Sequence, residues 1–201
     1  MADGGLILTP AELVDDRVDQ GIFRVDRSIY TDQAVFSAEM ERIFERGWVY
    51  LCHESQVPEE GSYFATEIGL QPVVVMRQKD GGLRTFVNAC SHRGAILTPV
   101  KQGQAKVLTC RFHGWAYNCD GRCVRVKNEE EGFGADGFDR SRFNLTQIER
   151  TESYRGFVFG SLTDRVNPLI DYLGAAATWI DLLVEQSPEG LEVVPGNSTY
   201  V

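Results

Sequence analysis

Two short Cys–His pairs constrain the fold of this chain more than any other feature of its sequence. One residue separates Cys90 from His92, two residues separate Cys110 from His113, and seventeen residues lie between the pairs. A glycine follows each pair closely, which is typical of tight loops. Two thiolates and two imidazoles on two such loops predict a four-ligand metal site. The remainder of the chain must then fold so that the two loops meet.

The overall composition indicates a globular protein and argues against several functional classes. The chain has 201 residues, is 43% hydrophobic and carries a formal net charge of −9. An acidic chain without runs of Lys or Arg is not expected to bind nucleic acid or an anionic membrane surface. No apolar run approaches the roughly 18 residues that span a bilayer. The N-terminal residues lack the basic start and apolar core of a signal peptide, so we expect a cytoplasmic protein.

The remaining cysteines and the third histidine give weaker signals. The chain has five Cys, an odd number that argues against a disulfide framework in a reducing compartment. Cys119 and Cys123 provide too few ligands for a closed metal site, and we expect them to be free thiols. His53 is one of only three His. Because no incomplete ligand set calls for it, we expect a packed or exposed histidine there.

The hydrophobic pattern changes from helical to β-like at Gly47. Apolar residues at helical spacing, including Phe36, Met40 and Ile43, predict a helix over residues 31–47. Beyond it, short Val-, Phe-, Tyr- and Thr-rich stretches alternate with turn signals such as Asp80-Gly81-Gly82. The expected strands are 48–52, 63–68, 72–77, 83–88, 106–109, 115–118, 122–126, 145–153 and 156–161. We therefore predict a compact antiparallel β domain in the middle of the chain.

The flanking segments have a different character. The acidic, Gly-rich stretch 128–142 is predicted to be an exposed loop. Asn167-Pro168 is expected to start a helix that continues to residue 186. Residues 191–194 and 198–201 have strand-like composition. We expect Val201 to lie within a strand, with a further domain following it.

Four residues within or beside the Cys–His loops have two interpretations each. Trp115 and Tyr117 alternate along an expected strand, where core packing is the default and shielding of the metal from water is the alternative. Arg93 is either a solvated charge or a contact to a partner subunit. Ser91 is either an ordinary loop serine or a hydrogen-bonding group close to the metal.

The order of the ligands argues against zinc. In zinc fingers both Cys precede both His, and the His lie three to five residues apart. Here each loop supplies one Cys and one His. The two Cys can then bind one metal while the two His bind its neighbour, as in a Rieske [2Fe–2S] centre. The arrangement Cys-x-His-x17-Cys-x2-His therefore favours two irons over one zinc.

The two motifs resemble the Rieske family. Cys90-Ser91-His92-Arg93-Gly94 and Cys110-Arg111-Phe112-His113-Gly114-Trp115 are similar to those of the large (α) subunit of aromatic-ring-hydroxylating dioxygenases. Respiratory-type Rieske proteins carry an extra Cys in each loop, which form a disulfide; Ala95 and Phe112 stand at the corresponding places here. Residues 152–162 and 186–193 look most like the benzoate/toluate/anthranilate branch, which implies an aromatic carboxylate substrate.

The resemblance implies the following fold and site. The fold is expected to be mainly β, with an antiparallel, β-sandwich-like Rieske domain, flanking helices and the start of a truncated α+β catalytic domain. The implied divisions are an N-terminal helical segment (1–47), the Rieske domain (48–163) and a linking helix with the first catalytic-domain strands (164–201). The implied cluster ligands are Cys90 and Cys110 on one iron and His92 and His113 on the other.

The resemblance also implies an activity. Electrons from NADH would reach the cluster through a separate reductase, with or without a ferredoxin, and pass to a mononuclear non-haem Fe(II) for O2-dependent cis-dihydroxylation of an aromatic ring. That iron needs two His and a carboxylate, and no His follows His113. We therefore expect the Fe(II) only in a missing C-terminal domain, and no catalytic residue in this chain. A homo-oligomer of large subunits, with or without a small β subunit, is implied as well.

Two other functional classes remain as alternatives. A stand-alone Rieske-type electron carrier would have the same cluster and no oxygenase activity. The helical segments outside the cluster domain favour the oxygenase, because a carrier needs only that domain. A zinc-binding interaction module is the third alternative.

Overall fold

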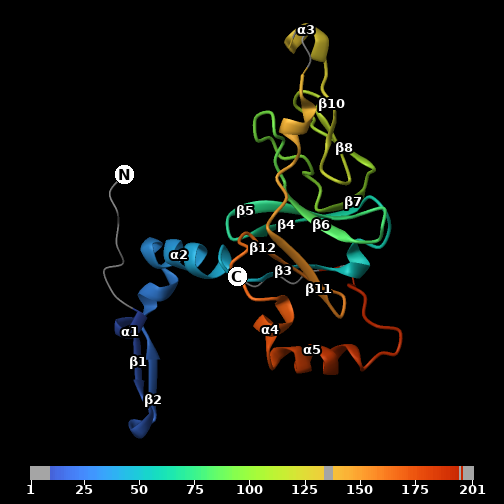
Figure 1. Ribbon diagram of the computed structural model, residues 1–201. Coiled ribbons are helices and arrows are strands. Elements are labelled where there is room, and N and C mark those ends of the chain that lie inside the picture. The colour runs from blue at the N-terminus through green and yellow to red at the C-terminus, as the bar shows by residue number, and fades with distance from the viewer. Residues whose placement is uncertain (1–9, 134–137, 195, 197–201) are drawn as a thin grey trace.

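Three antiparallel sheets form the body of the molecule, seen in a computed structural model that describes residues 10–133, 138–194 and 196 (Figure 1). The middle sheet has the order β6-β5-β4-β7, the upper sheet β10-β9-β8 and the lower sheet β11-β12-β3. This confirms the prediction of a mainly β, antiparallel fold. The strands are β3 (Val49–His53), β4 (Ser62–Ile68), β5 (Gln71–Arg77), β6 (Leu83–Val87), β7 (Gln102–Gln104), β8 (Val107–Thr109), β9 (Ala116–Asn118), β10 (Cys123–Arg125), β11 (Arg150–Tyr154) and β12 (Phe157–Ser161).

The central strand β5 is buried on both faces. Four consecutive residues, Val73 to Met76, have no solvent exposure. Successive side chains of a strand point to opposite faces. Val74 and Met76 accordingly contribute to an upper core together with both Cys–His loops, and Val73 and Val75 to a lower core. One strand thus supplies the floor of the upper core and the roof of the lower core.

The predicted hairpins close with the expected turns. Gly81 lies between β5 and β6 with φ of 81°. Arg155 and Gly156, with φ of 53° and 90°, join β11 to β12. Positive φ at both central residues is the requirement of a type I′ turn. The first strand of this hairpin starts at Arg150, five residues later than predicted.

Two pairings were not predicted from the sequence. β12 pairs with β3, which lies about a hundred residues earlier in the chain. β7, a strand of three polar or glycine residues, pairs with β4. The residues of β7 show no alternation of apolar and polar side chains that could predict a strand or its register. Its position is therefore set only by its pairing with β4.

The N-terminal segment forms an arm beside the body (Figure 1). A short helix α1 (Pro10–Leu13) leads into a hairpin of β1 (Val14–Arg17) and β2 (Ile22–Val25), which the sequence analysis did not predict. The predicted helix is present as α2 (Gln33–Glu39), capped by the Asp32 carboxylate, and it continues as a π-helical turn (Met40–Phe44). Two of the apolar side chains that predicted this helix are exposed, Phe36 at 40% and Ile43 at 58%.

Four predictions for the later segments need correction. Part of the expected acidic loop is a short helix, α3 (Glu129–Phe133). The single helix expected over 168–186 is divided at Gly174 into α4 (Leu169–Leu173) and α5 (Ala176–Val184). Asn167-Pro168 provides no side-chain cap; the Leu169 N–H donates to the Glu152 carboxylate of β11 instead. Residues 191–194 form no strand, and 198–201 lie outside the described residues.

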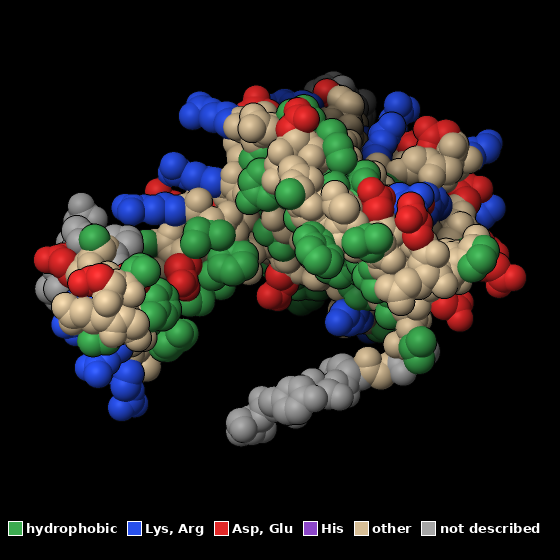
Figure 2. Space-filling view, turned by 90° about the horizontal axis from the view of Figure 1, so that it is seen from below, with side chains coloured by type: hydrophobic (Ala, Val, Ile, Leu, Met, Phe, Trp, Pro, Cys, Tyr) green, Lys and Arg blue, Asp and Glu red, His purple; other side chains and the backbone are tan. Residues whose placement is uncertain are grey.

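Large hydrophobic side chains are exposed on α4 and α5. Trp179 is 74% exposed, and Tyr172 and Leu182 are more than half exposed. Figure 2, which views the molecule from below, shows hydrophobic side chains on this face. An apolar surface of this kind marks an interaction site. Among the described helices, none combines the length and the apolarity required to cross a bilayer.

A close approach between a turn and the core gives a stability prediction. Gly121 has φ of 77°, and a Cβ there would lie 2.5 Å from the Phe86 ring. We expect Gly121→Ala to lower the free energy of unfolding by roughly 2–4 kcal/mol, from the backbone conformation and the overlap together. Gly81→Ala is the matched control, because Gly81 has a similar φ and no atom within 4 Å. It should cost about 1 kcal/mol in urea unfolding, and equal losses for both variants would contradict the close approach.

Candidate metal centre

The first Cys–His loop is closed by two backbone hydrogen bonds. The Cys90 N–H donates to the Ala95 carbonyl at 2.8 Å, and the Gly94 N–H donates to the Cys90 carbonyl at 2.8 Å. Gly94 has φ of 73°, a conformation that glycine adopts without steric cost. The loop follows β6, so the central sheet fixes where it begins.

The second loop, which follows β8, has the same construction. The Cys110 N–H donates to the Trp115 carbonyl at 2.7 Å, the Gly114 N–H donates to the Cys110 carbonyl at 2.9 Å, and Gly114 has φ of 72°. In both loops the glycine is the fourth residue after the Cys. The two loops are therefore of equal length, although their Cys–His spacings differ by one residue.

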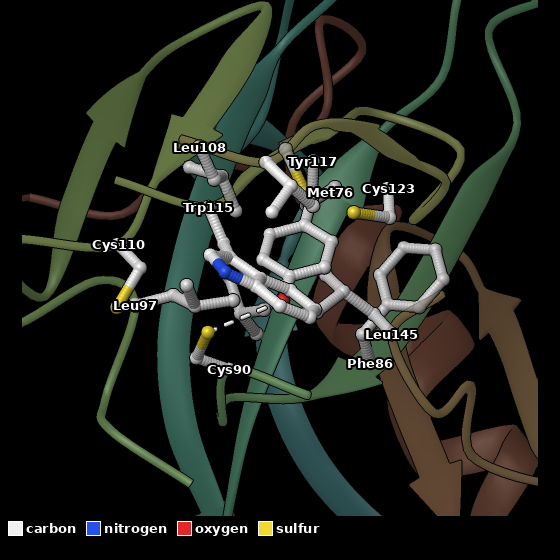
Figure 3. Packing of buried hydrophobic residues seen from close by; sticks show 12 residues of the cluster. Met76, Phe86, Cys90, Leu97, Leu108, Cys110, Trp115, Tyr117, Cys123 and Leu145 are labelled. Atoms are coloured by element: carbon white, nitrogen blue, oxygen red, sulfur yellow. Dashed lines mark hydrogen bonds between the residues drawn. The ribbon is translucent and has the colours of Figure 1, made fainter. Parts of the chain in front are cut away.

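The four candidate ligands lie in two pairs. Cys90 and Cys110 are each 3% exposed and belong to the upper core. Their sulfur atoms lie on the same side of that core, near Leu97 (Figure 3). The His92 and His113 rings meet edge to face, with centroids 4.7 Å apart and an interplanar angle of 76°. The structure thus places the two predicted Cys in one core and brings the two predicted His rings into contact.

The electrostatic surroundings suit metal binding by neutral imidazole. Burial, followed by the neighbouring His113 and Arg93, lowers the pKa of His92. A lowered pKa keeps the ring neutral, which is the form that binds a metal. Burial also raises the pKa of the Cys90 thiol, while the Tyr117 hydroxyl opposes that rise. A bound cation would supply the charge that stabilises the thiolate.

The donor set fits a two-metal centre better than a single ion. A tetrahedral zinc site requires four donors around one point. Two thiols in one place and two imidazoles in another match a [2Fe–2S] centre in which two His replace two Cys on one iron.

Tyr117 provides a hydrogen bond to one of the thiols. Its hydroxyl lies 3.2 Å from the Cys90 sulfur, drawn as a dashed line in Figure 3, and accepts from the Ser91 N–H at 3.1 Å. Because that N–H occupies an oxygen lone pair, the hydroxyl proton is available to the sulfur. Burial, then the bond to Cys90, raises the pKa of Tyr117. Tyr117 is fully buried, so the predicted core role is confirmed and a role at the thiol is added.

The other loop residues are also placed by the structure. The Ser91 hydroxyl donates to the Asn144 carbonyl at 2.9 Å and so acts as a loop anchor. Arg93 is exposed. Trp115 is buried and stacks on the His92 ring. A cavity of about 360 Å³ opens beside both histidines and is lined partly by Phe112 and Lys127.

The Cys and His residues that were not predicted to be metal ligands lie in ordinary packed positions. His53 is buried, accepts from the Ser55 N–H and lies edge-on to Phe157. None of the five cysteines forms a disulfide, and all five lie in the described part of the chain. The packed position of His53 agrees with its prediction.

Sequence reasoning missed Asn88. This buried side chain accepts from the Leu97 and Thr98 N–H groups at 3.2 and 3.1 Å and donates to the Thr98 hydroxyl at 2.9 Å. It fixes the chain on both sides of the first loop. The only signal in the sequence is an amide residue at the end of an apolar strand, which is too common to single out.

Comparisons with known proteins agree with this geometry. Residues 47–149 match the profile of the Rieske [2Fe–2S] domain family. The chain is 47% identical over 190 residues to toluate 1,2-dioxygenase subunit alpha of Pseudomonas putida, covering 94% of this chain and 42% of the relative. It is 47% identical over 189 residues to the anthranilate 1,2-dioxygenase large subunit of Acinetobacter baylyi, covering 93% and 40%. The chain thus spans about two fifths of the length of these curated relatives.

Solved structures show the same fold in more than one kind of oxygenase. Naphthalene 1,2-dioxygenase from Rhodococcus sp. superposes with a TM-score of 0.79 at 36% identity, over 85% of this chain and 39% of that chain. A quaternary ammonium Rieske monooxygenase superposes with a TM-score of 0.69 at 30% identity, over 79% and 43%. The fold by itself therefore does not distinguish dioxygenation from monooxygenation.

The Asn88 hydrogen bonds give a prediction about the first loop. Asn88→Ala leaves two buried backbone N–H groups unpaired and should lower the free energy of unfolding by about 2–5 kcal/mol. Asn118→Ala is the control, because Asn118 accepts one N–H, from Arg122, at the surface, where water can replace it. It should cost about 1 kcal/mol. Equal small losses in urea unfolding would show that Asn88 does not fix the loop.

Proposed function

This chain belongs to the Rieske [2Fe–2S] domain family, and we propose that Cys90 and Cys110 bind one iron of the cluster while His92 and His113 bind the other. The observation that carries the proposal is the pairing of buried thiols with edge-to-face imidazoles on two loops of equal construction. When bound, the cluster accepts and releases single electrons, with potentials of roughly −150 to +300 mV in this class. The chain's own residues hold it, exclude water and donate hydrogen bonds.

We further propose that the chain is the electron-transfer portion of a ring-hydroxylating dioxygenase large subunit. The support is 47% identity to subunits named for toluate and anthranilate 1,2-dioxygenation. Those names indicate a benzoate-like aromatic carboxylate as the substrate class. No His follows His113 in this sequence, so a mononuclear iron held by two His and a carboxylate, and the catalytic residues with it, would belong to a C-terminal domain.

The proposed organisation follows the expected divisions. Residues 1–47 are an N-terminal segment, 48–163 the Rieske domain, and 164–201 a linking helical segment with the start of the catalytic domain. The family match to 47–149 and the end of the last strand at Ser161 support the first two boundaries. The exposed apolar side chains of α4 and α5 would contact the catalytic domain or a second large subunit.

The proposed partners are those of a multicomponent oxygenase in the cytoplasm. An NADH-dependent reductase, directly or through a ferredoxin, would reduce the cluster. The relatives are named as alpha or large subunits, which supports an assembly that includes a small β subunit. A stand-alone electron carrier would need neither the N-terminal arm nor α4 and α5.

The ligand assignment predicts the iron content of matched variants. Wild-type protein should be coloured, bind about two irons per chain and give a reduced Rieske EPR signal. Cys90→Ser and His92→Ala should lose that signal. Cys119→Ser removes a free thiol outside the centre and should retain it. A colourless wild-type protein that binds one zinc per chain would refute the assignment.

The oxygenase assignment predicts an additional iron in the full-length protein. Expression of the complete gene product should give a third iron per chain and NADH-dependent dihydroxylation of a benzoate-like acid when a reductase is present. The chain of residues 1–201 alone should bind the cluster and oxidise no substrate. A full-length protein with two irons and no oxygenase activity would support the carrier instead.

The Tyr117 hydrogen bond predicts a change in redox potential. Tyr117→Phe keeps the buried ring and removes the donor to the Cys90 sulfur. Since that donor stabilises the more negative reduced state, the midpoint potential should fall in an EPR-monitored redox titration. Tyr63→Phe is the control, because Tyr63 packs against the same core and its hydroxyl lies beside Gly103 of β7. An unchanged potential in Tyr117→Phe would contradict the role of this bond.

A further inference from the structure

The two candidate histidine ligands have different aromatic neighbours. The Trp115 ring lies parallel to the His92 ring, with centroids 4.9 Å apart and an interplanar angle of 9°. Trp115 is 3% exposed. His113 instead contacts Phe112 at 4.4 Å and 57°, and Phe112 is 70% exposed. One imidazole is therefore covered by a buried ring, and the other by a ring that lies mostly in solvent.

Two phenylalanine rings contact the Trp115 ring in edge-to-face geometry. Phe138 and Phe143 meet it at 5.6 and 5.4 Å with interplanar angles of 80° and 82°. These two rings are themselves stacked at 4.7 Å and 19°. Edge-to-face and offset-stacked pairs each contribute about 0.5–1.5 kcal/mol beyond their buried area. The orientation of Trp115 is thus determined by several contacts that do not involve His92.

The segment that carries these phenylalanines is anchored beside the first loop. The Arg140 guanidinium contacts the Glu129 carboxylate at 2.7 Å. Asn144, next to Phe143, accepts from the Ser91 hydroxyl through its carbonyl and from the Cys123 N–H through its side chain, both at 2.9 Å. Since Ser91 directly precedes His92, the loop and the aromatic segment are tied together at the base of the stack.

We infer that Trp115 is a positioning residue that fixes the plane of the His92 ring, and that Phe138 and Phe143 hold Trp115 in place. The inference rests on the proposed assignment of His92 as a cluster ligand. A His ligand would be held at two points, its Cβ on the loop and one ring nitrogen on the metal, and the ring could still tilt between them with little change in donor distance. A parallel ring held at 4.9 Å determines the ring plane and keeps water from that face. Among the described residues, the rings that contact His113 are those of His92 and the exposed Phe112.

The test compares four variants of the cluster-loaded protein. Trp115→Leu removes the stack, Trp115→Phe keeps a smaller flat ring, and Phe143→Leu loosens the support without touching His92. Phe112→Leu is the control, because it removes the ring beside His113. Pulsed EPR of the reduced cluster resolves the nitrogen couplings of the two histidines. Release of iron to a chelator gives a second measurement that does not depend on activity.

Trp115→Leu should change the coupling of one histidine nitrogen and not the other, and iron release should be about tenfold faster. Trp115→Phe should restore most of both values, and Phe143→Leu should shift the same nitrogen by less. Phe112→Leu should leave that nitrogen and the release rate unchanged. If Trp115→Leu does not fold, Phe143→Leu decides, because unchanged couplings there overturn the inference.

The two proposals fail in different ways. Wild-type protein without a reduced Rieske signal would refute the ligand assignment. Wild-type protein with the signal, together with a Trp115→Leu variant of identical couplings, would refute only the role of Trp115. An equal effect of Phe112→Leu on the same nitrogen would also overturn it.

Discussion

The burial of β5 on both faces is the constraint on which the rest of the structure depends. A strand with apolar side chains on each side must be covered twice, which requires a layer above and a layer below. The upper layer consists of little more than three short strands and the two Cys–His loops. Val74 and Met76 therefore contact the same core that buries the thiols. The central sheet holds the metal centre in position without contributing a ligand to it.

The two Cys–His loops have the same backbone construction, but the residues that contact them differ. Both loops close with the same two backbone hydrogen bonds and a glycine of positive φ. The first loop is fixed by Asn88, donates a backbone N–H to Tyr117 and is anchored to residue 144 through Ser91. In the second loop, Phe112 beside His113 is mostly exposed. The two loops that would hold the cluster therefore differ in how firmly their neighbours fix them.

The fold alone is compatible with more than one reaction, and the similarity in sequence to named relatives narrows the choice further. Structures of a dioxygenase and a monooxygenase both superpose on this chain. The described residues build a site for passing electrons, and the exposed apolar surface of α4 and α5 indicates contact with more protein. Specificity for a benzoate-like acid, as proposed, would depend on residues of the catalytic domain that contact the ring.

The sequence by itself determined the antiparallel β character, and it predicted the four ligands and the two-metal layout. These follow from local facts: the spacing of scarce residue types, the alternation of apolar side chains and turn signals such as Arg155-Gly156. Only the tertiary structure decided which surfaces are covered. Phe36 on α2 is exposed, and the first N–H group of α4 donates to Glu152 of β11. Strand β12 pairs with a strand that lies about a hundred residues away in the sequence. The hydrogen bond from Tyr117 to Cys90 and the stack of Trp115 on His92 are likewise contacts across space. A linear pattern can indicate that an aromatic residue is buried, but its partner depends on how separate segments pack together.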